Sequence, residues 1–354
     1  MGAPNKIKKF KQMKRNLVVL AVLAPLLMFA ILIVVVLVQI ERSGPPPSPA
    51  LALGSRTPRT PSRVDVVYTW VDSGDAAWRS QRDSLTRRRI RAQLKTDAAR
   101  WPTLTKELSE LAISVKTVRA FMPWVHTIWV VTQRPHRIND PGLFFVHHDE
   151  LLDPAHLPTF NSQAIETGIH KIGGLSEHFI YMNDDFFVGK PIAKQDLFAG
   201  GKPIMRQDKK LHNWVKNHPL YHMFSKNSVG HGPAVIQMRK HMGRKVFGTD
   251  HQIVPLTRTL MRETEQKYQS EWDRTQGTAF RDTSNIAPVT MACNHGLHTG
   301  AVHVLRKDTL SSKAVKMRDF GRVVRSTPAL FCVHDITTPS QLKSLNEYVD
   351  GLIG

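Results

Sequence analysis

The sequence predicts an α/β domain preceded by a single transmembrane helix, and three features of the chain support this prediction. Apolar β-branched runs alternate with helical periodicity after residue 63, which is typical of a sheet with crossover helices. Residues 17–38 are 22 consecutive apolar residues without a charge. The chain has 354 residues, of which 41% are hydrophobic, so it is long enough to bury a large core.

The first 63 residues divide into a tail, an anchor and a stalk. Residues 1–16 are basic and contain no acid, and residues 17–38 are long enough to cross a bilayer core as a helix. Residues 39–63 are rich in proline and favour extended polyproline II. Because the basic flank lies on the N-terminal side, the positive-inside rule predicts a cytoplasmic N-terminus and translocation of residues 64–354.

A cleaved signal peptide is the alternative interpretation of the apolar run. Ala50-Leu51-Ala52 has the small-x-small form of a cleavage site. However, the run is longer than the apolar part of a signal peptide, and this site lies beyond a proline cluster. The layout of tail, anchor, stalk and domain is that of a secretory-pathway transferase. It predicts a single-pass type II protein of the Golgi membrane with a lumenal catalytic domain.

The formal net charge is +20, which suits anionic partners such as nucleotide phosphates or an anionic glycan. A solvated basic surface without a specific partner explains the charge equally well. No zinc-finger or RNA-recognition signature occurs, so we predict no nucleic-acid partner. The chain has two cysteines, Cys293 and Cys332, which excludes a disulfide scaffold and leaves open whether these two pair.

Four runs rich in β-branched and aromatic residues are predicted as strands, and they lie at 64–70, 126–132, 143–147 and 178–182. Residues 107–120 carry apolar side chains at helical spacing, residues 161–170 are predicted as a short helix, and residues 76–100 are helix-permissive. After residue 200 the pattern weakens. There we predict a helix at 239–264, a loop at 280–285 and a late strand at 329–333.

Two acidic turns directly follow predicted strands. Asp72 and Asp75 follow the first strand, and Asn183-Asp184-Asp185 follow the fourth. In open α/β sheets ligands bind beyond the carboxyl ends of the strands. Carboxylates there suit Mg²⁺ or Mn²⁺, which can bridge diphosphate oxygens and offset charge on a leaving group. A purely structural role remains open, because Asp and Asn are common in turns and at helix N-caps.

Two further residues have side chains suited to phosphate and hydroxyl chemistry. His231 lies in the loop-like Gly230-His231-Gly232-Pro233, and an imidazole with a near-neutral pKa can act as a general base on an acceptor hydroxyl. Arg281, in Phe280-Arg281-Asp282, can hold a phosphate in bidentate fashion. The 17 histidines show no zinc-site spacing.

Several segments resemble the conserved blocks of the Stealth proteins, hexose-1-phosphoryltransferases that include the catalytic subunit of N-acetylglucosamine-1-phosphotransferase. Residues 64–75, VDVVYTWVDSGD, resemble the first block. Residues 104–190 resemble the second, through LSELAISVKTVRAFMPWVHTIWVVT, VHHDELL and LPTFNSQAIETGIHKIGGLSEHFIYMNDDFFVGK. The third block is met at residues 231–233 and 280–282. The fourth is met at residues 329–335, where His334 stands in place of the family's usual Asn.

The resemblance implies a Rossmann-like nucleotide-sugar-binding domain with helical additions, forming one catalytic domain over residues 64–354. It implies that a hydroxyl of a glycan or glycoprotein attacks the phosphate nearer the sugar of a nucleotide-sugar, of UDP-GlcNAc or GDP-mannose type. The nucleoside monophosphate then leaves and a phosphodiester forms. The implied cofactor is Mg²⁺ or Mn²⁺. Two alternatives remain, a metal-dependent glycosyltransferase that transfers sugar alone and a non-catalytic glycan-binding homologue.

The resemblance also implies roles for individual residues. Metal ligation falls to Asp184, Asp185 and Asp335, and catalysis to His231, Asp185 and Arg281. Substrate contacts fall to five residues, Asp72, Asp75, Asn183, Glu166 and His170. Glu166 and His170 lie on a predicted helix, where packing explains them as well as catalysis does.

Overall fold

The computed structural model describes residues 60–91, 109–134, 140–208, 231–243, 246–249, 253–305 and 310–354. All of them belong to one compact unit, Pro58–Gly354. The predicted tail, the predicted transmembrane helix at 17–38 and nearly all of the predicted stalk lie outside these residues. Across the described ranges, no helix combines the length and the apolar character needed to cross a bilayer.

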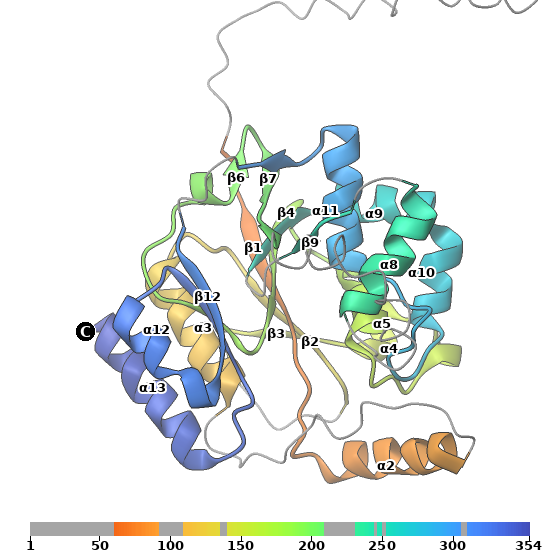
Figure 1. The fold of residues 1–354 in the computed structure, drawn as a ribbon, viewed down its shortest axis with the longest axis horizontal. Helices are drawn as coiled ribbons and strands as arrows, with labels where there is room; N and C mark the ends of the chain where they lie inside the picture. The colour runs from red at the N-terminus through yellow and green to blue at the C-terminus, as the bar shows by residue number, and fades with distance from the viewer. Residues whose placement is uncertain are drawn as a thin grey trace, which may run out of the picture. The chain divides into compact units, whose positions relative to one another are not determined.

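A five-stranded sheet lies at the centre of this unit, in the order β10-β4-β1-β2-β3 (Figure 1). Its strands are β1 (Val64–Thr69), β2 (Ile128–Thr132), β3 (Phe144–His147), β4 (His178–Asn183) and β10 (Val254–Thr257). The first four are parallel to their neighbours, and β10 pairs antiparallel with β4 at the edge. The four strands predicted from apolar runs are confirmed, with shifts only at their ends.

The order of the parallel strands creates a switch point between β1 and β4. The chain proceeds from β1 outward to β2 and β3, and then returns to the other side of β1 with β4. The strand register places Thr69 opposite Asn183 at the carboxyl ends of β1 and β4. In sheets of this kind the ligand crevice lies at such a point. Both predicted acidic turns therefore begin at the edge where a ligand is expected.

The sheet buries both of its faces, because side chains alternate along each strand. One face, with Val67 and Phe179, belongs to the core formed with the helices between residues 231 and 299. The opposite face, with Val66 and Ile180, belongs to the core formed with α3 (Glu110–Phe121). Figure 1 shows these helical groups on either side of the sheet. The helices on the first side are α8 (His231–Met242), α9 (Arg258–Lys267), α10 (Gln269–Gln276) and α11 (Pro288–Thr299).

A second sheet joins the C-terminal segment to the turn after β4. Its order is β12-β13-β5, with β12 (Ser312–Lys316), β13 (Leu330–His334) and β5 (Phe186–Val188). β13 runs antiparallel to β5, and the Val333 N–H donates to the Asp185 carbonyl at 3.2 Å. Helix α13 (Pro339–Ile353) packs on this sheet. The pairing brings the end of β13 beside the acidic turn.

The remaining elements are short or peripheral. They are α2 (Ala76–Arg91), α4 (His148–Leu151), α5 (Ser162–Glu166), α12 (Gly321–Ser326), β6 (Phe198–Ala199), β7 (Lys202–Met205), β8 (Gln207–Asp208), β9 (Gly248–Thr249) and β11 (His303–Val304), with single 3-10 turns at Pro154–His156, Ile169–Lys171, Lys194–Asp196 and Met317–Asp319. The short helix predicted at 161–170 is thus divided into α5 and a separate turn.

The continuous helix predicted at 239–264 is wrong. Helix α8 ends at Met242, and Gly243 follows with a φ of +61°, which glycine adopts without steric cost. Residues 254–257 form the edge strand β10 before α9 begins. Pro255 has no N–H to donate, which an edge strand tolerates and a helix interior does not.

The two cysteines do not form a disulfide. Cys293 and Cys332 are free and lie in the cores on opposite faces of the sheet.

Candidate active site

The turn after β4 divides its polar residues between the two faces of the sheet. Asn183, the last residue of the strand, bonds to Thr69 and Tyr181 on the face covered by α9 and α11. Asp184 and Asp185 form the turn into β5, and their charges act on Glu110 at the start of α3. Two polar groups therefore flank the carboxyl end of β4.

The first group, here the acidic cluster, consists of Glu110, Asp184 and Asp185. Glu110 is the first residue of α3, after Ser109, whose hydroxyl caps the helix by accepting from the Ala112 N–H at 3.1 Å. Burial, and then the charges of Asp184 and Asp185, raise the pKa of Glu110 to about 9. Burial, and then the charge of Asp185, raise the pKa of Asp184 to about 7. Folding thus brings carboxylates together that repel one another.

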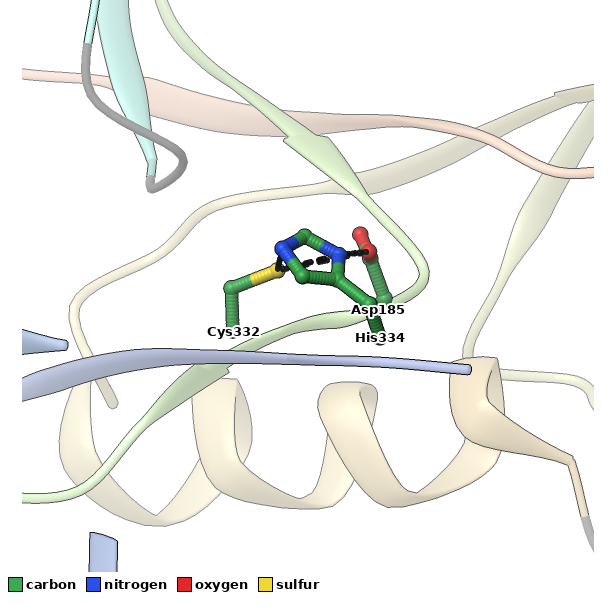
Figure 2. Close-up of side chains that lie close together, drawn as sticks. All are labelled: Asp185, Cys332 and His334. Atoms are coloured by element: carbon green, nitrogen blue, oxygen red, sulfur yellow. Dashed lines mark hydrogen bonds and ion pairs between the residues drawn. The ribbon is translucent and has the colours of Figure 1, made fainter. Parts of the chain in front are cut away.

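Asp185 also belongs to a group with Cys332 and His334 at the end of β13, and Figure 2 shows the three side chains pointing toward one another. Asp185 Oδ2 lies 3.0 Å from His334 Nδ1 and 3.3 Å from Cys332 Sγ. Cys332 Sγ lies 3.4 Å from His334 Nδ1. Burial, and then the charge of Asp185, raise the pKa of the Cys332 thiol well above its usual value. One carboxylate thus takes part in both groups.

These residues fit a divalent cation. The second oxygen of Asp185, Oδ1, is buried and has no hydrogen-bond partner among the described residues. An orphaned buried oxygen costs free energy, and so do neighbouring, partly buried carboxylates. A cation would offset both terms. Carboxylate oxygens suit Mg²⁺ and Mn²⁺, and an imidazole nitrogen is a further ligand for transition metals.

The second group, here the polar cluster, consists of Thr69, Glu166, Tyr181 and Asn183. The Tyr181 hydroxyl oxygen lies within hydrogen-bond distance of three groups, 3.2 Å from Glu166 Oε1, 2.9 Å from Asn183 Oδ1 and 3.1 Å from Thr69 Oγ1. Burial raises the pKa of Glu166 to about 7, against the opposing effects of the Val289 N–H, the charge of Arg281 and the Tyr181 hydroxyl. Burial, and then the charge of Glu166, raise the pKa of Tyr181 well above its usual value.

Asp72 and Asp75, in the turn after β1, have different surroundings. Asp72 is buried, its Oδ1 accepts from the Gly74 N–H at 3.1 Å, and its backbone N–H and carbonyl bond to the Gln133 amide. Asp75 Oδ1 accepts from the Trp78 N–H at 2.6 Å and caps α2. The capping role that the sequence left open for Asp75 is therefore present, and Asp72 lies closer to the protein interior.

The other predicted site residues are dispersed. Arg281 lies close enough to Glu166 to lower its pKa, and its Nη2 donates to Ser162 Oγ at 2.6 Å. His170 is buried, pairs through Nε2 with Glu265 at 2.8 Å and stands edge-on to Trp272. Asp335 is exposed, has a φ of +62° and pairs with Lys316 at 2.9 Å. His231 is the first residue of α8, and its side chain lies outside what the structure describes.

Sequence reasoning missed Glu110, Tyr181 and the placement of His334. A signal for Glu110 was present, because Glu110, Ser114 and Thr117 share one face of α3 by their spacing. Ser114 and Thr117 are fully buried there, and they bond to Tyr68 and to the Val188 N–H. A polar stripe on the buried side of a helix indicates a polar environment that the helix faces.

Conserved region 2 of the Stealth proteins matches residues 105–205. A capsular polysaccharide phosphotransferase of Haemophilus influenzae is 32% identical over 266 residues, which cover 72% of this chain and 70% of that protein. An exopolysaccharide phosphotransferase of Streptomyces coelicolor is 33% identical over 317 residues, 83% of this chain and 50% of that protein. A crystal structure of a galactosyltransferase, solved with donor and acceptor sugar analogues, aligns with 81% of this chain and 95% of its own at 10% identity, with a TM-score of 0.40.

The chain belongs to the Stealth family and is a phosphotransferase. It spans 70% of the Haemophilus relative but only half of the Streptomyces relative. These relatives correct the predicted localisation. They are proteins of bacteria, which have no Golgi apparatus, so the placement in a Golgi membrane with a lumenal catalytic domain is wrong.

Proposed function

We propose that residues 64–354 transfer a hexose-1-phosphate from a nucleotide-sugar to a hydroxyl group of a glycan, with Mg²⁺ or Mn²⁺ as cofactor. The observation that carries this proposal is the convergence of Glu110, Asp184 and Asp185 at the carboxyl end of β4, beside the switch point of the sheet. Membership of a phosphotransferase family supports the reaction class. The names of the relatives, which are polysaccharide phosphotransferases, support a glycan acceptor.

The reaction forms one phosphorus–oxygen bond and breaks another. The acceptor oxygen attacks the phosphorus nearer the sugar, and the bond between this phosphorus and the bridging diphosphate oxygen breaks. The nucleoside monophosphate leaves, and the product is a phosphodiester between the sugar and the acceptor. The hydroxyl proton passes to a general base, for which His231 is the candidate from its sequence motif.

Each group at the sheet edge has a part in this proposal. The acidic cluster holds the cation, which would offset the negative charge on the diphosphate and on the leaving group. Asp72, buried after β1, lines the nucleotide site. Asn183 and Glu166 hold the donor through the polar cluster, and Arg281 beside Glu166 contacts a phosphate. A donor of UDP-GlcNAc or GDP-mannose type fits this scheme.

A donor screen tests the proposed reaction. The purified full-length chain is incubated with UDP-GlcNAc or GDP-mannose, a capsular polysaccharide acceptor and Mg²⁺ or Mn²⁺, and the products are identified by mass spectrometry. We expect UMP or GMP and a phosphodiester-linked sugar. Release of UDP or GDP with no phosphate on the acceptor would contradict the proposal and identify a transferase of sugar alone.

A further inference from the structure

We propose that Asp185, Cys332 and His334 form a site for a borderline-soft divalent cation, and that Zn²⁺ is the common ion that the site prefers. The group offers one oxygen, one sulfur and one nitrogen, and these atoms lie within 4.8 Å of one another. Mg²⁺ prefers oxygen ligands alone, whereas thiolate and imidazole ligands favour Zn²⁺ and Co²⁺. This inference deepens the proposed function, because Asp185 also belongs to the acidic cluster.

The spacing of the three donor atoms agrees with a tetrahedral shell. Zinc binds nitrogen and oxygen at about 2.0 Å and sulfur at about 2.3 Å, so neighbouring ligand atoms lie roughly 3.3 to 3.6 Å apart. The separations here are 3.0 Å from Asp185 Oδ2 to His334 Nδ1, 3.3 Å from Oδ2 to Cys332 Sγ and 3.4 Å from Sγ to Nδ1. Cys332 Sγ also lies 3.6 Å from His334 Nε2, so the imidazole has to rotate before one cation can bind both Nδ1 and Sγ.

The surroundings give a cation access to the three ligands. They also provide an open fourth position. Cys332 is buried, whereas the side chains of Asp185 and His334 are 24% and 31% exposed, so solvent reaches the group from their side. Three protein ligands with an open fourth position are typical of zinc sites that accept water or substrate. On binding, the Cys332 proton passes to solvent, and the thiolate becomes the ligand.

His334, the last residue of β13, supplies the nitrogen of this group. An amide offers a hard oxygen to a cation, whereas an imidazole offers a nitrogen suited to transition metals. Replacing His334 with Asn is therefore expected to lower the preference of the group for Zn²⁺. The neighbouring Asp335 does not take part, because it is exposed and paired with Lys316.

Cobalt binding tests the site without any need for turnover. Co²⁺ is added to the metal-free, reduced full-length chain, and a thiolate-to-cobalt charge-transfer band is followed in the near ultraviolet, with Zn²⁺ as competitor. We expect the band in the wild type, its loss on addition of Zn²⁺ and its persistence in excess Mg²⁺. Absence of the band, or its displacement by Mg²⁺ as readily as by Zn²⁺, would overturn the inference.

The variants locate the signal. Cys332→Ser should abolish the band, and the matched variant Cys293→Ser should keep it, because Cys293 is an equally buried free thiol in the opposite core. His334→Asn should weaken Zn²⁺ binding by at least about 100-fold, since losing an outer-shell partner alone costs about 10- to 100-fold. Circular dichroism checks that each variant folds. A band that survives both Cys332→Ser and His334→Asn would place the cation elsewhere.

Transfer activity with Mg²⁺ or Mn²⁺ is a separate measurement. The proposed transfer reaction and the proposed zinc site can therefore fail independently.

Discussion

The acidic cluster and the polar cluster lie at the same end of β4, but they differ in how their polar side chains are paired. In the polar cluster, Tyr181 bonds to Glu166, Asn183 and Thr69, so the buried groups satisfy one another. In the acidic cluster, burial and mutual repulsion raise the pKa of Glu110 and Asp184, and Asp185 Oδ1 has no partner among the described residues. The side chains of the polar cluster therefore bond to one another, whereas the acidic cluster would gain stability from the proposed cation.

Replacing Asp185 with Asn should have the largest effect on activity. The variant removes a negative charge that both the acidic cluster and the Cys332–His334 group use. We expect a loss of about 1,000-fold in nucleoside monophosphate release, since a bound cation supplies several kcal/mol of charge stabilisation. Asp319→Asn, an exposed carboxylate on another turn, is the matched control. If the activity of Asp185→Asn stayed within tenfold of the wild type, the proposal that Mg²⁺ or Mn²⁺ at the acidic cluster supports transfer would fail.

Glu110→Gln tests the acidic cluster further, because Glu110 lies far in sequence from the other two members, Asp184 and Asp185. We expect transfer to fall about 100-fold, as the cation loses one of its carboxylates. Removal of this partly buried acid next to Asp184 should at the same time raise the unfolding free energy at neutral pH. Activity assays and urea denaturation measure the two effects, with the exposed Glu347→Gln as control. Unchanged activity would reduce Glu110 to a structural role.

The polar cluster should make stability depend on pH through Glu166. Its pKa is raised from 4.5 to about 7, so the folded protein holds the proton more tightly than the unfolded chain does. This contribution to stability is present below pH 4.5, declines as the pH rises to about 7, and changes little above that. Glu166→Gln should remove this decline, which amounts to about 3 kcal/mol of unfolding free energy for a pKa shift from 4.5 to about 7. Urea denaturation of both proteins across this pH range measures it, and parallel curves would contradict the assignment.

Tyr181→Phe should have the smallest effect of the four. It removes the hydroxyl that Glu166, Asn183 and Thr69 share, and the expected loss is about 1.5 kcal/mol of unfolding free energy. Tyr348→Phe is the matched control, since the Tyr348 hydroxyl is buried without a hydrogen-bond partner among the described residues. That variant should be close to neutral. Equal losses in both variants would mean that the hydrogen bonds of the polar cluster contribute nothing measurable.

Local patterns in the sequence predicted much of the fold. The four parallel strands were confirmed because each is a continuous apolar run, and the helix at 107–120 was confirmed, as α3, because its apolar residues repeat with the helical period. The prediction at 239–264 failed where Pro255 and its neighbours join the sheet edge, since tertiary pairing overrides a weak helical pattern there. The order of the strands had no local signal at all.

At the candidate site, too, some features follow from local sequence and others depend on tertiary contacts. The sequence by itself determined the acidic turn at Asn183-Asp184-Asp185, the placement of that turn directly after a buried strand, and the resemblance to Stealth proteins. Only the tertiary structure decided that Glu110 and His334 join Asp185, and that Asp335 does not. A turn is encoded by neighbouring residues, whereas these partners meet through the packing of α3 on the sheet and the pairing of β13 with β5. Those contacts depend on the whole chain having folded.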